Sequence, residues 1–276
     1  MFKFLYLTLM TICFTCMLAQ QGKAEVITIA GSSTVKKFIR IAADAYSSRH
    51  PETQFIINSG GSTAGFAELI DGRIQIGMMS RELTNKEANQ LSAIQHLVVA
   101  IDAVVPIVSR EVFQSGIRKI DLPSLARIYK GEIVNWSELG GIDKEILVAD
   151  KEVHRGTHFV FAKAVFGDPN ETGSNRAIIL GDNKEVVNLV SSSDQAIGYV
   201  SFAFAKGDVA PLSLTIHDKV VAADIPNIRD EAYPMARKLY LLIPKDAPDY
   251  VAEFVRFALS KEASILVKKA GYIPVN

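Results

Sequence analysis

The chain has 276 residues, of which 30 are basic and 30 are acidic, so its formal net charge at neutral pH is +0. This balance argues against broad binding of nucleic acids, which requires a surplus of basic side chains. Hydrophobic residues make up 49% of the chain. That fraction is enough for a sizeable buried core, and the length allows one or two domains.

Residues 1–24 have the pattern of a cleaved secretory signal peptide. One lysine precedes an apolar run from Phe4 to Ala19, and a polar stretch then ends in Gly22-Lys23-Ala24. The apolar run is short for a membrane span, and no other run approaches about 20 apolar residues. We expect cleavage after Ala24 and a periplasmic location, with a retained membrane anchor as the alternative.

Both cysteines of the chain, Cys13 and Cys16, lie in this leader. Ile12 and Thr15 precede them, and neither fits the small residue that a lipoprotein signal places before its cysteine. The mature chain then has no thiol, no disulfide and no cysteine metal site. That composition suits an exported protein large enough to be stabilised by its core alone.

Apolar runs and segments of helical spacing alternate along the chain. The runs predict strands at 26–30, 53–57, 73–79, 97–108, 146–149, 196–200 and 239–243. The segments of helical spacing predict helices at about 35–46, 66–70, 122–129, 157–166, 183–190, 248–259 and 261–270. This alternation indicates an α/β fold with helices on both faces of a sheet.

Two local signals define helix starts in the first part of the chain. Ser33 or Thr34 is the expected N-cap of the first helix. Thr84 and Glu87 have the spacing of a capping box, in which each side chain bonds the backbone of the other residue.

Four loops that follow strands share one chemical character. They are rich in Ser, Thr, Gly and basic residues, and they read GSST (31–34), NSGGSTAG (58–65), MMSR (78–81) and ADKEVHRGT (149–157). Ligands of α/β sheets bind at the carboxyl ends of strands, where helix N-termini offer unpaired N–H groups. Hydroxyl and guanidinium donors would complete an anion site that needs no metal. Capping and turn formation alone are the alternative explanation of each single loop.

The order of these motifs resembles the phosphate-binding proteins of ABC phosphate importers, in the type II periplasmic binding protein superfamily. The resemblance covers nearly the whole mature chain. It is carried by GSSTV, GGSTAGFAELIDG, IGMMSREL, IYKGEIVNWSELGG, SSSDQAIGYVS, YPMARKLYLLIP and the terminal AGYIPV. It implies two α/β lobes joined by crossing strands, with an oxyanion held in the cleft between the lobes. The crossings would be the long strand around Asp102 and the strand at 238–243.

The resemblance also implies the domain limits and the partners. The first lobe would comprise 25–105 plus 235–276, and the second 106–234. The chain would capture inorganic phosphate or a related oxyanion for the permease subunits of an ABC transporter, as a monomer without catalysis, cofactor or metal. A sensor or adhesion partner in place of a permease stays open as an alternative.

The matching positions imply a set of ligand-binding residues. They are Ser33, Thr34, Val35, Ser62, Ser80, Arg81, Lys151, Arg155, Gly156 and Thr157. Within this set the fourth loop departs from the family pattern, which usually reads Gly-Ser-Gly-Thr after an arginine. One donor hydroxyl is lost there, and a cation stays nearby.

The third loop bears on the choice of anion. Phosphate carries an O–H donor near neutral pH and sulfate carries none, so a carboxylate acceptor would exclude sulfate. Arg81 occupies the matching position and can only donate. An acceptor would have to come from Asp102, Asp150 or Glu152, so we expect weaker exclusion of sulfate, arsenate or molybdate than a carboxylate-bearing site gives.

Two other classes of site were weighed. Gly60-Gly-Ser62-Thr-Ala64 imitates the nucleophile elbow of a serine hydrolase, but Ala64 stands where the pattern has its second glycine. His154 and His158 are spaced for one helix face, as in a zinc site, but no third ligand is evident. Both alternatives are therefore weaker than an anion-binding cleft.

Overall fold

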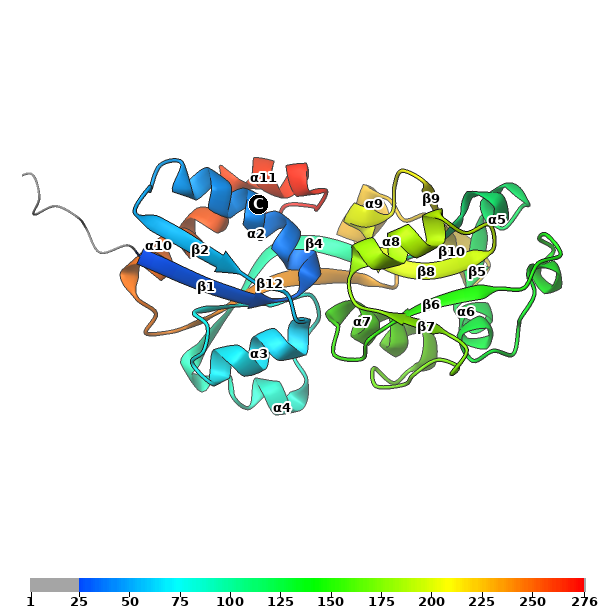
Figure 1. Cartoon of the computed structure of the whole chain (residues 1–276), viewed down its shortest axis with the longest axis horizontal. Coiled ribbons are helices and arrows are strands. Elements are labelled where there is room, and N and C mark those ends of the chain that lie inside the picture. Colours follow the sequence, from blue (N-terminus) through cyan, green and yellow to red (C-terminus); the bar gives the residue numbers. More distant parts are fainter. Residues whose placement is uncertain (1–24, 276) are drawn as a thin grey trace, which may run out of the picture.

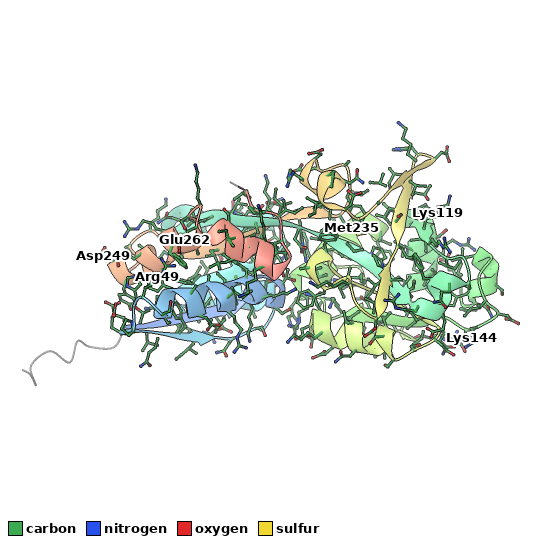
Figure 2. The ribbon with its side chains drawn as sticks, turned by 90° about the horizontal axis from the view of Figure 1, so that it is seen from above. Arg49, Lys119, Lys144, Met235, Asp249 and Glu262 are labelled. Atoms are coloured by element: carbon green, nitrogen blue, oxygen red, sulfur yellow. The ribbon has the colours of Figure 1, made fainter. Side chains whose placement is uncertain are left out.

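The computed structural model describes residues 25–275, so the predicted signal peptide lies outside the described residues. Figure 1 shows two lobes side by side, with the long strands β4 (Ile94–Ser109) and β12 (Ala236–Pro244) running from one to the other. The first lobe holds β1–β3, α2–α4, α10 and α11, and the second holds α5–α9 and β5–β11. Figure 2 gives the view from above, in which Arg49 and Glu262 lie on the first lobe and Lys119 and Lys144 on the second.

The remaining strands are short, and most of them lie close to where the sequence predicts them. They are β1 (Glu25–Gly31), β2 (Thr53–Ile57), β3 (Ile76–Met79), β5 (Lys119–Asp121), β6 (Leu147–Lys151), β7 (Ile178–Leu180), β8 (Ala196–Ser201), β9 (Val209–Pro211), β10 (Ser213–Ile216) and β11 (Lys219–Val221). The sequence reading missed β5, β7 and β9–β11, each of which has only three or four residues and no clear alternation.

The helices follow the strands in α/β order. They are α2 (Ser33–Ser47), α3 (Ser62–Ile70), α4 (Asn85–Ala88), α5 (Arg110–Gln114), α6 (Leu122–Tyr129), α7 (Gly156–Phe166), α8 (Asn183–Ser191), α9 (Ile225–Arg229), α10 (Asp249–Ala258) and α11 (Ala263–Ala270). Three 3₁₀ turns complete the set, at η1 (Leu91–Ala93), η2 (Trp136–Leu139) and η3 (Phe202–Phe204). Within residues 25–275, none of these helices combines the length and the apolar character that crossing a bilayer requires.

The sheet of the first lobe is covered on both faces. Its strands run in the order β2-β1-β3-β12-β4, and β1 is parallel to both of its neighbours. Helices α2, α10 and α11 pack their apolar faces on one side, and α3 packs on the other. Gly65 of α3 lies so close to β1 that a Cβ there would sit 2.5 Å from the Cα of Gly31. Glycine is required for that approach of helix to strand.

The second lobe continues the same sheet through β4. The order there is β4-β8-β6-β7, β9 pairs with the far end of β4, and β11-β10-β5 form a separate three-stranded sheet. The core contains the fully buried side chains of Tyr129, Trp136, Phe161 and Tyr199. The rings of Phe161 and Tyr199 stack with centroids 3.8 Å apart.

Two antiparallel strands connect the lobes, as expected from the resemblance. β4 leads from the first lobe into the second and β12 returns, with Asp102 directly opposite Arg237 in the register. After β12, helices α10 and α11 pack back on α2. The predicted fold class, an α/β protein of two lobes joined by crossing strands, is therefore confirmed. Each lobe has its own main apolar cluster, but the cluster of the second lobe also takes in Ala103, Val105 and Met235, so the exact lobe limits stay a prediction.

Two local predictions shift by a few residues. The N-cap of α2 is Ser32, one residue before the expected position, because the Ser32 hydroxyl accepts the N–H of Val35. The third strand begins at Ile76 and not at Arg73, because Arg73 donates its backbone N–H to Glu68 in the turn that ends α3. The capping box of Thr84 and Glu87 is present as predicted, at the start of α4.

Candidate functional site

The N-termini of four helices converge where the lobes meet. Two of these helices, α2 and α8, are capped by the side chains of Ser32 and Asp182. The other two, α3 and α7, begin after Gly61 and Arg155, and neither residue gives a side-chain hydrogen bond to the first turn. The N-termini of α3 and α7 therefore lack a side-chain cap and bring partial positive charge to the cleft, although Thr63 of α3 already donates its N–H to the carbonyl of His154 over 3.4 Å.

Hydroxyl groups line the cleft between these termini. Ser32 donates to the hydroxyl of Ser80 over 2.8 Å, and the backbone N–H of Ser80 donates to the hydroxyl of Ser62 over 3.1 Å. The cleft is narrow, with a cavity of about 10 Å³, about the space of a single water. Its lining residues are Ser32, Ser33, Gly61, Ser80, Lys151, Arg155, Gly156, Thr157 and Gly181. None of these is acidic, so the lining offers donors and positive charge.

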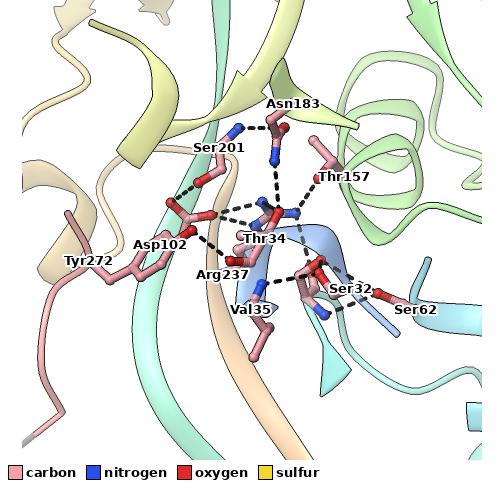
Figure 3. A network of polar contacts seen from close by, with 11 residues as sticks. Ser32, Thr34, Val35, Ser62, Asp102, Thr157, Asn183, Ser201, Arg237 and Tyr272 are labelled. Atoms are coloured by element: carbon pink, nitrogen blue, oxygen red, sulfur yellow. Dashed lines mark hydrogen bonds and ion pairs between the residues drawn. The ribbon is translucent and has the colours of Figure 1, made fainter. Parts of the chain in front are cut away.

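Arg237 lies beside the cleft, in the strand β12 that connects the two lobes, at the centre of a polar network (Figure 3). Its Nε and Nη2 donate to Oδ2 of Asp102 over 3.0 and 2.8 Å, and the two side chains are 3% and 0% exposed. The Ser201 hydroxyl donates to the other carboxylate oxygen over 2.9 Å. Arg237 Nη1 reaches the Ser80 carbonyl at 3.0 Å and the Thr157 hydroxyl at 3.2 Å. One guanidinium thus contacts both lobes.

Thr34 accepts hydrogen bonds from three residues, the first of which is Arg237, whose Nη2 lies 3.5 Å from the Thr34 hydroxyl (Figure 3). Its hydroxyl accepts from Nδ2 of Asn183 in the second lobe over 3.1 Å, and its carbonyl accepts from the Tyr272 hydroxyl over 2.8 Å. Asn183 accepts in turn from the backbone N–H of Ser201. The chain of bonds fixes the start of α2 against the start of α8.

Lys151 is a buried cation in the wall of the cleft. Its residue is 2% exposed, and its Nζ donates to the carbonyl of Asp182 over 3.0 Å. Burial lowers the pKa of Lys151 to about 7, although Asp182 acts in the opposite direction. Its ammonium is therefore close to half-charged at neutral pH, and a neighbouring anion would favour the charged form.

The side chain of Arg81 is bonded to residues outside the cleft lining. Its guanidinium makes a bidentate ion pair with Glu87, with both N–O distances at 2.7 Å, and also donates to Thr63. Burial raises the pKa of Glu87, but the hydrogen bonds from Arg81 and Thr84 outweigh burial and leave the pKa below its usual value. The guanidinium carbon lies 4.9 Å from the ring centre of Phe159 in α7. Arg81 thus links α4 to the second lobe.

Two further predicted contacts also have local partners. The backbone N–H of Val35 donates to the Ser32 cap, and the Arg155 guanidinium donates twice to Oε2 of Glu152, over 2.8 and 2.5 Å. Arg155 nevertheless lines the cleft, as do the predicted residues Ser33, Ser80, Lys151, Gly156 and Thr157. Ser62 and Thr34 are bonded to Ser80 and Asn183, whereas Val35 and Arg81 have partners elsewhere.

Sequence reasoning missed Ser32, Asn183, Ser201 and Arg237. One signal could have found Arg237: it is a charge at the start of a strand that is otherwise apolar. Asp102 is its counterpart in the other long apolar strand, and two opposite charges in buried strands suggest a pair. The sequence predicts Asp102 only as a possible acceptor for the ligand's proton. Its oxygens instead accept from Arg237 and Ser201.

The residues of the two rival sites lie in unrelated settings. The Ser62 hydroxyl has Ser80 as its neighbour and no histidine partner. His154 pairs with Glu152 on the loop, whereas His158 is buried in α7 with its Nδ1 unpartnered. Across residues 25–275, the His, Cys, Asp and Glu side chains form no group of three that could hold a metal ion.

Comparison with known proteins identifies the family. Residues 18–262 match the family described as a PBP superfamily domain. The chain belongs to the PBP superfamily. Several relatives match about nine-tenths of this chain, and their names agree with the resemblance seen in its motifs.

A phosphate-binding protein PstS of Bacillus subtilis is 26% identical over 260 residues, covering 91% of this chain and 81% of that protein. A substrate-binding protein of a putative phosphate ABC transporter from Clostridium perfringens, solved with bound phosphate, shares 27% identity and a TM-score of 0.83. The match covers 91% of this PBP-superfamily chain and 100% of that one. An ABC-type phosphate transport receptor from Vibrio cholerae shares 28% identity and a TM-score of 0.74 over 90% of this chain and 99% of that one. The predicted resemblance to PstS-type binding proteins is confirmed.

Proposed function

We propose that this chain is an exported solute-binding protein that holds inorganic phosphate between its lobes and presents it to an ABC importer. The observation that carries the proposal is the cleft itself. The uncapped N-termini of α3 and α7, several hydroxyls and the cations Lys151 and Arg155 border one narrow space without an acidic lining residue, and Arg237 bonds to Ser80 and Thr157 of that lining. Such a set of donors suits a tetrahedral oxyanion.

The named relatives support phosphate as the oxyanion. The Bacillus subtilis relative is named a phosphate-binding protein, and the Clostridium perfringens protein was solved with phosphate. By the same relation we propose that permease subunits are the partners and that the chain works by binding and not by catalysis. A location outside the cytoplasmic membrane, and a monomeric state, belong to the same proposal.

We propose a contact set that follows the donors around the cleft. The anion would be bound by Ser33, Thr34, Ser62, Ser80, Lys151, Gly156, Thr157 and Arg237, with Ser32, Asp102, Asn183 and Ser201 holding these groups in place. Arg155 would close the outer edge of the cleft. Val35 and Arg81 stay predictions as ligand contacts, with their present partners pointing to structural roles.

Weak discrimination against sulfate follows from this contact set. The cleft lining has no carboxylate to accept the proton of phosphate, and the oxygens of Asp102 already accept from Arg237 and Ser201. A hydroxyl can accept that proton, but it repels sulfate far less than a carboxylate does. We therefore expect phosphate to be preferred over sulfate by less than about a thousandfold, roughly 4 kcal/mol.

Calorimetric titration of the mature protein with phosphate, sulfate, arsenate and molybdate at one pH tests the proposal. Ser62→Ala should keep the fold and weaken phosphate binding by about 10- to 150-fold, roughly 1.5–3 kcal/mol for a hydrogen bond to a charged group. Ser48→Ala, at the far end of α2, is the matched control and should bind like the wild type. Binding of none of the four anions would refute the proposal, and a tighter fit of sulfate or molybdate would refute phosphate as the ligand.

A further inference from the structure

A second cavity opens beside the cleft, on the side of α2. It has a volume of about 390 Å³, which lies in the range of small-molecule sites and far exceeds the space in the cleft. It is lined by Ser33, Lys36, Lys37, Arg40, Ile41, Ser59, Asp182, Asn183, Lys184 and Phe204. Ser33 belongs to both cavities, so the two are neighbours across the first turn of α2.

The charge of this cavity is strongly unbalanced. Its lining includes four cations, Lys36, Lys37, Arg40 and Lys184, and a single carboxylate, Asp182. Oδ1 of that carboxylate accepts the N–H groups of Lys184 and Glu185, the second and third residues of α8, as a helix cap. Among the ion pairs of residues 25–275, none involves any of the four cations. The cavity therefore holds positive charge that the protein does not neutralise.

Closure of the lobes brings these cations together. Lys36, Lys37 and Arg40 come from α2 of the first lobe, and Lys184 comes from α8 of the second. Burial lowers the pKa of Lys37, and the charges of Lys206 and Lys184 lower it further. Like charges brought together in a partly buried cavity repel, so the closed form carries an electrostatic cost that an anion would remove.

One of the cations is already positioned toward the second lobe. The Nζ of Lys37 donates to the carbonyl of Ala203 over 2.9 Å and lies 4.4 Å from the ring centre of Phe204. Lys36 reaches only the hydroxyl of Ser59, at 3.5 Å. Phe204 and Ile41 supply an apolar wall beside the charged groups. A ligand here would touch both lobes at once.

From this charge and size we infer a second anion site in this cavity, suited to a compound with two linked phosphoryl groups, such as a diphosphate. The excess of cations over the one carboxylate exceeds the charge of a single phosphate ion, and the cavity has room for more than one phosphoryl group. Because α2 and α8 both line it, a bound diphosphate would favour the closed form and so strengthen binding in the cleft. This inference extends the proposed phosphate cleft but does not depend on it.

Equilibrium dialysis of the mature protein with radiolabelled pyrophosphate tests this inference. Orthophosphate is present at about ten times its own dissociation constant, so that the cleft is filled. We expect pyrophosphate to bind alongside orthophosphate, with one pyrophosphate per chain. The double variant Arg40→Gln/Lys184→Gln should bind pyrophosphate about 25-fold more weakly, at about fivefold for each cation removed.

The matched control is Arg49→Gln/Arg256→Gln, which removes the same charge from a separate cavity on the back of the first lobe. Its pyrophosphate affinity should stay within about twofold of the wild type. Equal losses in both double variants, or stoichiometric displacement of pyrophosphate by orthophosphate, would overturn the second site. Titration with orthophosphate alone tests the cleft separately. If orthophosphate does not bind there, the pyrophosphate experiment still tests the second cavity.

Discussion

At the scale of single residues, the candidate site depends on charges held inside the protein. Arg237 is anchored by Asp102, which holds its Nη1 in one fixed orientation toward the Thr157 hydroxyl and the Ser80 carbonyl beside the cleft. A guanidinium held in this way loses little conformational entropy when an anion binds. Lys151 forms no ion pair within the described residues, and burial brings its pKa to about 7 although the charge of Asp182 acts in the opposite direction. Its charge state should therefore respond to the ligand.

Phosphate binding at pH 8 should be accompanied by proton uptake at Lys151. The pKa of the free lysine is about 7, so it is mostly neutral at pH 8, and a neighbouring anion raises that pKa. The stabilisation from a charged Lys151 is complete below pH 7 and is lost as the pH rises through the pKa of the bound form. Calorimetry in two buffers with different protonation enthalpies measures the uptake.

The variant Lys151→Met isolates this effect from the titration of phosphate itself. The wild type should take up more protons than the variant at pH 8, by a difference approaching one. Lys206→Met, outside the cleft lining, serves as the control. Equal proton uptake in wild type and Lys151→Met would show that this lysine does not sense the anion.

At the scale of elements, the site is built from helix starts that meet across the lobe boundary. The start of α7 approaches the start of α3 so closely that only glycine fits at position 156. A Cβ on Gly156 would lie 2.4 Å from the Ser62 hydroxyl oxygen and 2.6 Å from that of Ser80. The guanidinium of Arg81, which is paired with Glu87, also lies over the ring of Phe159 in α7. These contacts form only when the lobes are together.

Gly156→Ala should therefore weaken phosphate binding without unfolding either lobe. The added methyl group opposes closure by roughly 1–3 kcal/mol, which corresponds to about 5- to 150-fold in affinity. Titration calorimetry gives the affinity, and thermal unfolding without ligand should give an unchanged melting temperature. The control is Gly60→Ala, whose nearest new neighbour, the Ala64 Cβ, is 3.3 Å away. Wild-type affinity in Gly156→Ala would contradict the proposed closure.

At the scale of the whole molecule, the two lobes have largely separate apolar cores and share the strands β4 and β12. Cores of this kind move as rigid bodies, and the bending is taken up by a few residues of the connecting strands. One of these strands, β12, has a shift of pairing register between Leu239 and Tyr240. We therefore expect the lobes to open and close about the crossing.

Small-angle scattering should show this motion directly. We expect the radius of gyration of the mature protein to fall when phosphate is added at saturation, because the lobes approach each other. Gly156→Ala should keep a larger radius at the same degree of saturation. An unchanged radius in the wild type, with binding demonstrated by calorimetry, would argue against hinge closure.

The sequence by itself determined most of the elements and the place of the cleft. Runs of β-branched residues gave β1, β2 and β8 their positions within one or two residues, and the capping box at Thr84 and Glu87 marked the start of α4. Helical periodicity and capping depend on neighbours within one or two turns, so the local sequence is sufficient for them. The donor-rich loops were visible for the same reason.

Only the tertiary structure decided which side chains serve the cleft. Arg237 and Asp102 are 135 residues apart and become partners through the register of β12 on β4. The sequence motif predicts Arg81 as a ligand contact. In the structure, the Arg81 guanidinium instead forms a bidentate ion pair with the buried Glu87 of α4. Strand register and burial depend on contacts between distant segments, and a buried charge takes the partner that folding brings to it.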